Sequence, residues 1–372
     1  MSKKRNLLSD VEKVLLMGPG PSMVHDSVYR ALSSPTLGHL DPYFILIMDE
    51  TKRQLQKVFK TGNRLTLPIS GTGSAGMETS LVNFIEKDDP VLVLINGVFG
   101  RRLKEMAERL GASVDSLEFE WGTPVLPERV RATLEESAYK IVAVVHAETS
   151  TGVCNPVKEI GKLVRGTDSL YLVDAVTSLG GMELAVDEWG IDMVYSGTQK
   201  CLSCPPGLSP VSVSDRALEV LLHRETRVPD WYLDLSLIVN YWEGEKRAYH
   251  HTAPINMIYA LHQALDNLLE EGLEAAWARH RKYHEVLVKG LQKLGLEMFV
   301  DESFRLPMLN AVIVPAGVDE AAVRKRLRED FRIEIGAGLG PMAGKVWRIG
   351  LMGETCRPEN VERILSALGK IL

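Results

Sequence analysis

The sequence predicts an α/β fold in which helices flank a mostly parallel sheet, followed by a smaller α+β unit. The first observation is that short runs rich in Val, Ile and Leu alternate with segments of helical periodicity over about 200 residues. The second is that these runs are continuously apolar, as strands covered on both faces are. The predicted strands cover residues 64–69, 91–95, 141–145, 170–173, 191–195 and 208–213. The predicted helices between them cover residues 74–86, 99–111, 127–138 and 156–165.

A third observation separates the later chain from this first part. Residues 255–294 show helical periodicity nearly throughout, with one break at Glu271-Gly272. We therefore expect a large domain over residues 23–271 and a small C-terminal domain over residues 272–372. Within the small domain the sequence predicts strands at 309–314, 332–335 and 346–351 and helices at 319–330 and 358–370.

The composition excludes several classes of protein. A hydrophobic content of 45% and a charged content of 25% are typical of a globular protein. The net charge of −6, without a dense basic run, gives no reason to expect a nucleic-acid partner. No apolar stretch reaches the roughly 18 residues of a membrane helix, and the basic opening MSKKRNLLSD has no apolar core like that of a secretory signal. We expect a cytoplasmic protein with no membrane partner.

The four cysteines do not form a disulfide framework in a chain of 372 residues. Cys201 and Cys204 make a C-x-x-C pair, which could indicate zinc or redox chemistry. No second pair and no H-x-x-x-H motif accompanies it, so we predict no metal site.

Glycine and polar residues follow five of the predicted strands. Because ligands bind outside the carboxyl ends of the strands in open α/β sheets, these segments are expected to converge on one site. They are residues 70–76 (SGTGSAG), 96–100 (NGVFG), 146–152 (HAETSTG), 174–178 (DAVTS) and 196–200 (SGTQK).

The first of these segments contains a G-x-G-x-x-G pattern at residues 71–76. After a strand and before a helix, this pattern could bind a dinucleotide. The free N–H groups at a helix N-terminus would suit any phosphate equally well. It could also be a tight turn that needs glycine for structural reasons alone.

Lys200 is the residue that discriminates between these interpretations. It follows a strand, and no other charged residue lies near it in sequence, which indicates a pocket and not a solvated helix face. Burial lowers the pKa of a lysine, and the neutral amine is the form that attacks an aldehyde. Asp174 ends an earlier strand, where its carboxylate could hold a pyridinium nitrogen protonated or could cap the next helix.

Several longer motifs carry a family resemblance. SGTQK at 196–200 with Pro205-Pro206-Gly207 resembles the cofactor-lysine segment of class V (fold type I) pyridoxal-phosphate aminotransferases. Further segments are similar to the alanine–glyoxylate and serine–pyruvate branch of that family. They are GPGPS at 18–22, HAETSTG at 146–152, Asp174 with SLGG at 178–181, YHHT at 249–252, and GLG at 338–340 with GKVWRIGL at 344–351. The resemblance extends from about residue 14 to about residue 370, and it implies a large domain with a seven-stranded sheet.

The resemblance implies a role for each matching position. Lys200 would form a Schiff base with pyridoxal 5'-phosphate and move the substrate proton, and Asp174 would pair with the pyridine nitrogen. Phe99 would stack on the ring, at a position where eukaryotic relatives commonly carry Trp. Arg348 would receive the substrate carboxylate, although an Arg beside a strand is often a surface residue. The other positions implied to hold the cofactor, most of them at its phosphate, are Thr72, Gly73, Ser74 (where some relatives carry His), Thr149, Thr177, Gln199 and, from the second subunit, Tyr249 and Thr252.

The resemblance also implies a homodimer with shared active sites, on whose partner subunit residues 1–22 would pack. The two histidines beside Tyr249 invite a zinc or general-base interpretation. They have no carboxylate or cysteine partner at ligand spacing, which argues against it.

The implied reaction is a ping-pong transfer of an amino group from alanine or serine to glyoxylate or a similar 2-oxo acid. A 3-hydroxykynurenine transaminase or another class V enzyme would share these motifs. A lyase or desulfurase of the same fold needs a reactive thiol on a mobile loop, and the Gly-rich loop at 336–344 contains no cysteine. An NAD(P)-dependent dehydrogenase that uses GTGSAG would leave Lys200 and Arg348 without a function, and a protein without activity would leave Lys200 idle.

Overall fold

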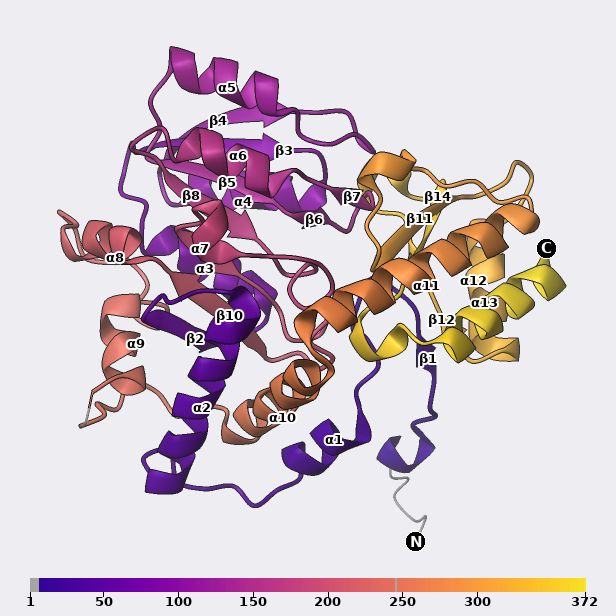
Figure 1. Cartoon of the computed structure of the whole chain (residues 1–372), viewed down its shortest axis with the longest axis horizontal. Helices are drawn as coiled ribbons and strands as arrows, with labels where there is room; N and C mark the ends of the chain where they lie inside the picture. Colours follow the sequence, from indigo (N-terminus) through magenta and orange to yellow (C-terminus); the bar gives the residue numbers. More distant parts are fainter. Residues whose placement is uncertain (1–6, 245) are drawn as a thin grey trace, which may run out of the picture.

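In the computed structural model, which describes residues 7–244 and 246–372, a sheet forms the centre of the larger domain (Figure 1). Its seven strands in the described part of the chain are β2 (Leu65–Ser70), β3 (Pro90–Ile95), β4 (Ser113–Glu118), β5 (Ile141–Val145), β8 (Leu170–Asp174), β9 (Met193–Tyr195) and β10 (Leu208–Val213). The strand order is β2-β10-β9-β8-β5-β3-β4, and β10 runs antiparallel to both of its neighbours while the other pairs are parallel. The predicted α/β fold with a mostly parallel sheet is confirmed.

Strand β4 was not predicted from the sequence. This strand lies at the sheet edge, where it pairs with β3 alone, and its side chains alternate between exposed and half-buried. A polar edge strand has no continuous apolar run by which it could be recognised. A short hairpin of β6 (Ala147–Glu148) and β7 (Val153–Cys154) was also not predicted.

The four helices predicted between the strands are present. They are α3 (Gly73–Val82), α4 (Val98–Arg109), α5 (Pro127–Glu136) and α6 (Val157–Val164). Helix α3 ends earlier than predicted, at Val82, because the Asn83 side-chain amide donates to the carbonyl groups of Thr79 and Leu233. The remaining helices of the larger domain are α1 (Asp26–Leu32), α2 (Pro42–Phe59), α7 (Val186–Trp189), α8 (Asp215–Leu222), α9 (Leu235–Trp242) and α10 (Ile255–Glu271).

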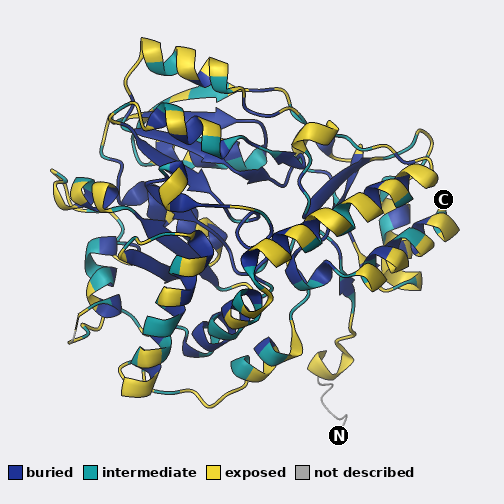
Figure 2. Cartoon of the chain, viewed as in Figure 1, coloured by how far each residue is buried: buried dark blue, intermediate teal, exposed yellow. Residues whose placement is uncertain are grey.

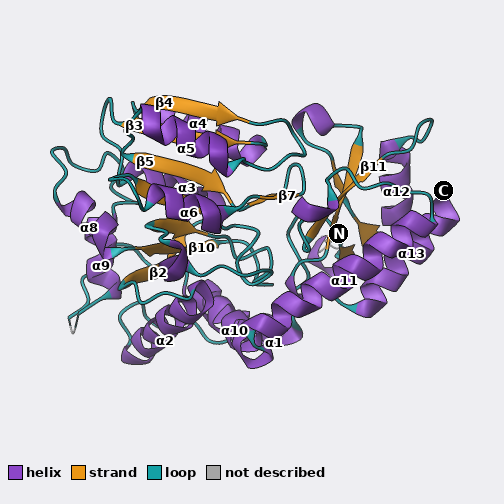
Figure 3. Cartoon of the chain, turned by 45° about the horizontal axis from the view of Figure 1, so that its top comes forward, coloured by secondary structure: helices purple, strands orange, loops and turns teal. Residues whose placement is uncertain are grey.

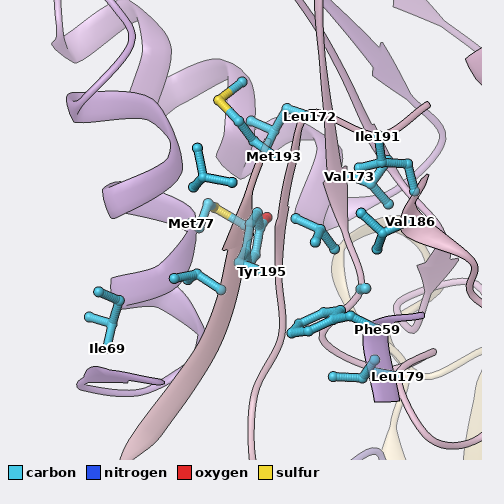
Figure 4. Close-up of a cluster of buried hydrophobic side chains, with 14 of the residues drawn as sticks. Phe59, Ile69, Met77, Leu172, Val173, Leu179, Val186, Ile191, Met193 and Tyr195 are labelled. Carbon is cyan, nitrogen blue, oxygen red and sulfur yellow. The ribbon is translucent and has the colours of Figure 1, made fainter. Parts of the chain in front are cut away.

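The hydrophobic core of the larger domain packs around β8 and β9. Figure 4 shows Leu172 and Val173 of β8 beside Met193 and Tyr195 of β9, with Met77 of α3 packed against them. Figure 2 shows that over the whole fold the strands are buried, whereas the outer faces of the helices are exposed. Because both strands are fixed by this packing, the residues at their carboxyl ends are held in place.

The C-terminal domain has a three-stranded antiparallel sheet, β11-β14-β13, packed against helices (Figure 3). Its elements are α11 (Leu273–Lys293), β11 (Leu309–Ile313), α12 (Glu320–Asp330), β12 (Ile333–Glu334), β13 (Gly336–Ala337), β14 (Val346–Gly350) and α13 (Pro358–Ile371). The break between α10 and α11 lies at Gly272, beside the predicted domain boundary. Short 3-10 helices cover Leu7–Asp10, Glu302–Phe304, Gly340–Met342 and Gly353–Thr355.

The N-terminal segment contacts both domains of its own chain. Strand β1 (Leu15–Leu16) pairs in parallel with β12, and the Ser22 hydroxyl donates to the carbonyl of Lys200 at 2.6 Å. Residues 1–6 of the predicted 1–22 segment lie outside the described residues. No helix within residues 7–244 or 246–372 is long and apolar enough to cross a bilayer.

Candidate active site

A pocket of about 190 Å³ lies at the carboxyl ends of the parallel strands. All five segments predicted to converge contribute to its lining. The lining residues that the sequence analysis named are Thr72, Gly73, Ser74, Phe99, Thr149, Asp174, Thr177, Gln199 and Lys200. Met77 and Arg102 also line it and were not predicted, whereas Ala147 and Val176 belong to the predicted segments and Val145 ends a predicted strand.

Lys200 follows β9 and lies under the N-terminal segment. Its ammonium donates to the carbonyl oxygen of Pro19. Gly20 has φ +102°, and a Cβ there would lie 2.7 Å from the Lys200 Cδ, so this close approach requires glycine. Burial lowers the pKa of Lys200 to about 8, with a further contribution from Arg348, whereas Asp174 opposes the shift. Near neutral pH a usable fraction of this amine is therefore neutral and nucleophilic.

Asp174 is the last residue of β8, and its carboxylate is buried beside the pocket. The backbone N–H of Val176 donates to its Oδ1 at 2.8 Å, and the Tyr195 hydroxyl donates to its Oδ2 at 2.7 Å. Burial raises the pKa of Asp174 to about 6. The alternative role of Asp174 as a helix cap does not apply. Its carboxylate bonds to the turn that follows, but no helix begins there in the described chain. A buried carboxylate that lines a pocket favours a cationic partner there.

The first turn of α3 contributes to the lining of the pocket. The helix begins after Thr72, and no side chain in the described residues caps its N–H groups. Gly73, Ser74 and Gln199 line the pocket. Uncapped N–H groups and a positive helix end favour a phosphate.

Phe99 forms an aromatic wall of the pocket at the start of α4. The Arg102 guanidinium, one turn further along α4, lies 5.0 Å from the centroid of the Phe99 ring. Because residues three apart on a helix face the same side, this pair could have been recognised from the spacing of Phe99 and Arg102.

Arg348 lies on β14 and is 7% exposed, so it is not the surface residue that its position beside a strand of a small domain could have suggested. Its Nε donates to the Ala337 carbonyl at 2.7 Å, and its Nη1 donates to the Thr149 carbonyl at 3.2 Å. Burial lowers the pKa of Arg348 to about 10. Its two carbonyl partners carry no net charge, so the guanidinium can still bind an incoming carboxylate.

The comparisons with known proteins agree with this arrangement. Residues 24–358 match the family model described as Aminotransferase class-V.

The chain belongs to the class V aminotransferases.

Its relatives place it in the alanine–glyoxylate branch of that family. The chain is 42% identical to the alanine–glyoxylate aminotransferase of Drosophila melanogaster, over 96% of this chain and 92% of the relative. It is also 42% identical to the (S)-ureidoglycine–glyoxylate transaminase of Bacillus subtilis, over 100% and 93%. The crystal structure of an alanine–glyoxylate aminotransferase from Nostoc sp. superposes with a TM-score of 0.95 at 47% identity, over 97% of this chain and 96% of that one. The fold is therefore that of the fold type I aminotransferases, and the protein is a transaminase.

Class V aminotransferases imply pyridoxal phosphate, and the pocket fits this cofactor. The uncapped start of α3 suits its phosphate, the buried Asp174 suits its ring nitrogen, and Lys200 suits its aldehyde. The G-x-G-x-x-G pattern thus lies in an aminotransferase and not in a dehydrogenase.

Tyr249 and Thr252 do not line the pocket of their own chain. Tyr249 is 58% exposed, its hydroxyl lies 3.3 Å from the Thr252 hydroxyl, and its ring lies 4.9 Å from that of His39.

The adjacent histidines bond to each other, with 2.8 Å between the His250 and His251 Nδ1 atoms. No group of three or more His, Cys, Asp or Glu side chains in the described residues is arranged to hold a metal ion.

The C-x-x-C pair lies directly after Lys200. Cys201 and Cys204 are both buried and free, and burial raises the pKa of each thiol to about 12. A thiol with so high a pKa carries almost no thiolate near neutral pH, so neither has the properties of a reactive cysteine.

Proposed function

We propose that this class V aminotransferase binds pyridoxal phosphate through Lys200 and moves an amino group from alanine or serine to glyoxylate in a ping-pong reaction. The observation that carries the proposal is the convergence of a lysine, a buried carboxylate and an uncapped helix N-terminus on one pocket. The buried Arg348 of the other domain does not line this pocket, but it donates to the carbonyl of Thr149, which does.

When bound, the cofactor supplies an electron sink that stabilises negative charge at the substrate Cα. The residues of the chain bind and orient the cofactor and the substrate and transfer the proton. Asp174 keeps the ring nitrogen protonated, and Lys200, once its amine is free, holds and moves the Cα proton. Phe99 would cover one face of the ring, and Thr149 and Thr177 would bond to its polar edge. Thr72, Gly73, Ser74 and Gln199 would hold the phosphate.

Arg348 is proposed to bind the carboxylate shared by amino-acid and 2-oxo-acid substrates. A guanidinium fork matches a carboxylate through two parallel hydrogen bonds, and its burial strengthens both. Since every substrate of the reaction carries this group, one clamp serves both halves of the ping-pong cycle.

We further propose a homodimer in which Tyr249 and Thr252 complete the phosphate site of the partner subunit. Tyr249 packs on His39, next to the exposed Leu40. Tyr43 and Leu46 of α2 are exposed as well, and Tyr43 lines a groove of about 390 Å³. A patch of this kind is typical of a protein interface.

The choice of substrates needs a direct test, because relatives named for alanine and for ureidoglycine are equally similar, at 42% identity. Both names share glyoxylate, which supports glyoxylate as acceptor. The reconstituted enzyme should be assayed with alanine, serine, (S)-ureidoglycine and 3-hydroxykynurenine, each against glyoxylate and pyruvate. We expect the highest kcat/KM for alanine or serine with glyoxylate. Turnover with 3-hydroxykynurenine alone, or none with glyoxylate, would refute the proposal.

A further inference from the structure

Glu148 is a fully buried carboxylate behind the pocket that the proposed function does not use. It lies in β6, and four donors bond to it. Its Oε1 accepts from the backbone N–H and the hydroxyl of Ser150, at 3.0 and 2.6 Å. Its Oε2 accepts from the backbone N–H groups of Phe99 and Gly100, at 3.1 and 3.4 Å. Burial raises the pKa of Glu148, and the bonds from Ser150 oppose that rise.

Two of these donors belong to the first turn of α4. The carboxylate of Glu148 therefore fills the anion site at this helix N-terminus, whereas the equivalent site of α3 stays open to the pocket. Gly97 precedes the helix, and a Cβ there would lie 2.3 Å from the Glu148 Cδ. The backbone thus begins α4 directly against the carboxylate, which fixes Phe99, the second residue of the helix.

The other contact of Glu148 reaches the substrate clamp through one peptide group. The peptide that joins Thr149 to Ser150 points its N–H at Glu148 and its carbonyl at the Arg348 guanidinium. The negative charge of Glu148 and the positive charge of Arg348 therefore bind opposite ends of the same peptide dipole. This arrangement orients Thr149, which lines the pocket, and Arg348, which comes from the other domain.

We propose that Glu148 is a positioning residue that holds Phe99 against the cofactor and aligns Arg348 for the substrate carboxylate. This inference rests on the proposed function, because it assigns the residue that sets the geometry of that same site. Only a carboxylate can accept from all four donors, because both of its oxygens accept hydrogen bonds. In Glu148→Gln the amide NH₂ must face either the donors of α4 or those of Ser150, so one set loses its acceptor.

The test compares Glu148→Gln with the wild-type protein and with Asp192→Asn. Asp192 is a matched control, because it is also buried and accepts a backbone N–H, that of Tyr171 at 2.8 Å, away from the pocket. We would measure the Kd of pyridoxal phosphate for the cofactor-free protein, the circular dichroism of the bound cofactor, the KM for glyoxylate and the Tm.

For Glu148→Gln we expect a Kd for the cofactor that rises about 10- to 100-fold, as is usual for loss of a hydrogen bond to a buried charge. The dichroism band should change and the KM for glyoxylate should rise, whereas Asp192→Asn should lower the Tm and leave these three values unchanged. If Glu148→Gln lowers the Tm alone, Glu148 is merely structural and the inference is wrong.

Ser150→Ala keeps the test decisive if Glu148→Gln does not fold. It removes the hydroxyl that donates to Glu148 and accepts from the Val98 N–H at 2.9 Å. Ser150→Ala should raise the Kd of the cofactor and change its dichroism band as Glu148→Gln does, but to a smaller extent. Unchanged values would contradict the inference. Cofactor bound normally by the wild-type protein, with no effect in either variant, refutes this inference alone. A wild-type protein that binds no cofactor refutes the function on which it rests as well.

Discussion

Tyr195 donates a hydrogen bond of 2.7 Å to Asp174, from the end of β9 to the end of the neighbouring strand β8. Both side chains are buried. The bond stabilises the ionised form of a carboxylate that burial would otherwise push towards its neutral form. In our proposal an ionised Asp174 keeps the ring nitrogen of the cofactor protonated. Tyr195 therefore affects the reaction through the charge of Asp174, although it does not line the pocket.

Tyr195→Phe is expected to lower kcat about 10- to 100-fold, the effect of removing one hydrogen bond to a buried charge. The measurement is the single-turnover rate of the enzyme with alanine. Tyr171→Phe is the matched control, since the Tyr171 hydroxyl is equally buried but donates to the Val157 carbonyl at 3.0 Å. Equal rate losses in the two variants would show that the Tyr195 effect is only structural.

Asp174→Asn should change how the stability of the cofactor-free protein depends on pH. The pKa of Asp174 is raised from 3.8 to about 6 in the folded protein, so ionisation of this group costs stability as pH rises through that range. Asparagine does not titrate. The free energy of unfolding of the variant, relative to wild type, should therefore rise by about 2 kcal/mol between about pH 4 and about pH 7. Urea denaturation at both pH values measures this difference, and a constant difference would contradict the assignment.

Arg348→Lys retains the positive charge but loses the planar fork. We expect the KM values for alanine and for glyoxylate both to rise about 100-fold, as is usual when a buried charge pair is disrupted. Arg216→Lys serves as control, because Arg216 bonds to Asp168, Ser169 and Asp192, none of which lines the pocket. Steady-state kinetics with each substrate varied in turn makes the test, and a rise for only one of them would argue against a shared clamp.

The dimer proposal predicts complementation between two inactive subunits. Lys200→Ala removes one half of a site, and Tyr249→Ala combined with Thr252→Ala removes the half that the partner contributes. In randomly mixed dimers, half of the molecules are hybrids and each hybrid has one intact site. Co-expression should therefore restore roughly a quarter of the wild-type activity. No recovery in verified hybrid dimers would show that Tyr249 and Thr252 act in their own chain.

The strands, the helices between them and the place of the site followed from the sequence, because local patterns determine them. Apolar runs mark buried strands, and Lys200 and Asp174 each follow such a run directly. Edge strand β4 was missed since half of its side chains face solvent.

The contacts between distant segments could not be predicted from such patterns. The period-2 pattern places Tyr195 on one face of a strand, but only the strand order places it beside Asp174. The bond between Arg348 and Thr149 joins residues 199 positions apart and different domains. Glu148 was visible within HAETSTG, yet its direction depends on the β6–β7 hairpin that the sequence did not reveal.

Borohydride reduction followed by mass spectrometry of the peptides tests whether Lys200 binds the cofactor covalently. One pyridoxal phosphate per chain should be found on the peptide that contains Lys200, and none on the Lys200→Ala protein. With the cofactor-free protein, attachment should become faster as pH rises through about 8, since burial lowers the pKa of this amine from 10.5 to that value. Cofactor fixed to another lysine, or no fixed cofactor at all, would contradict the account.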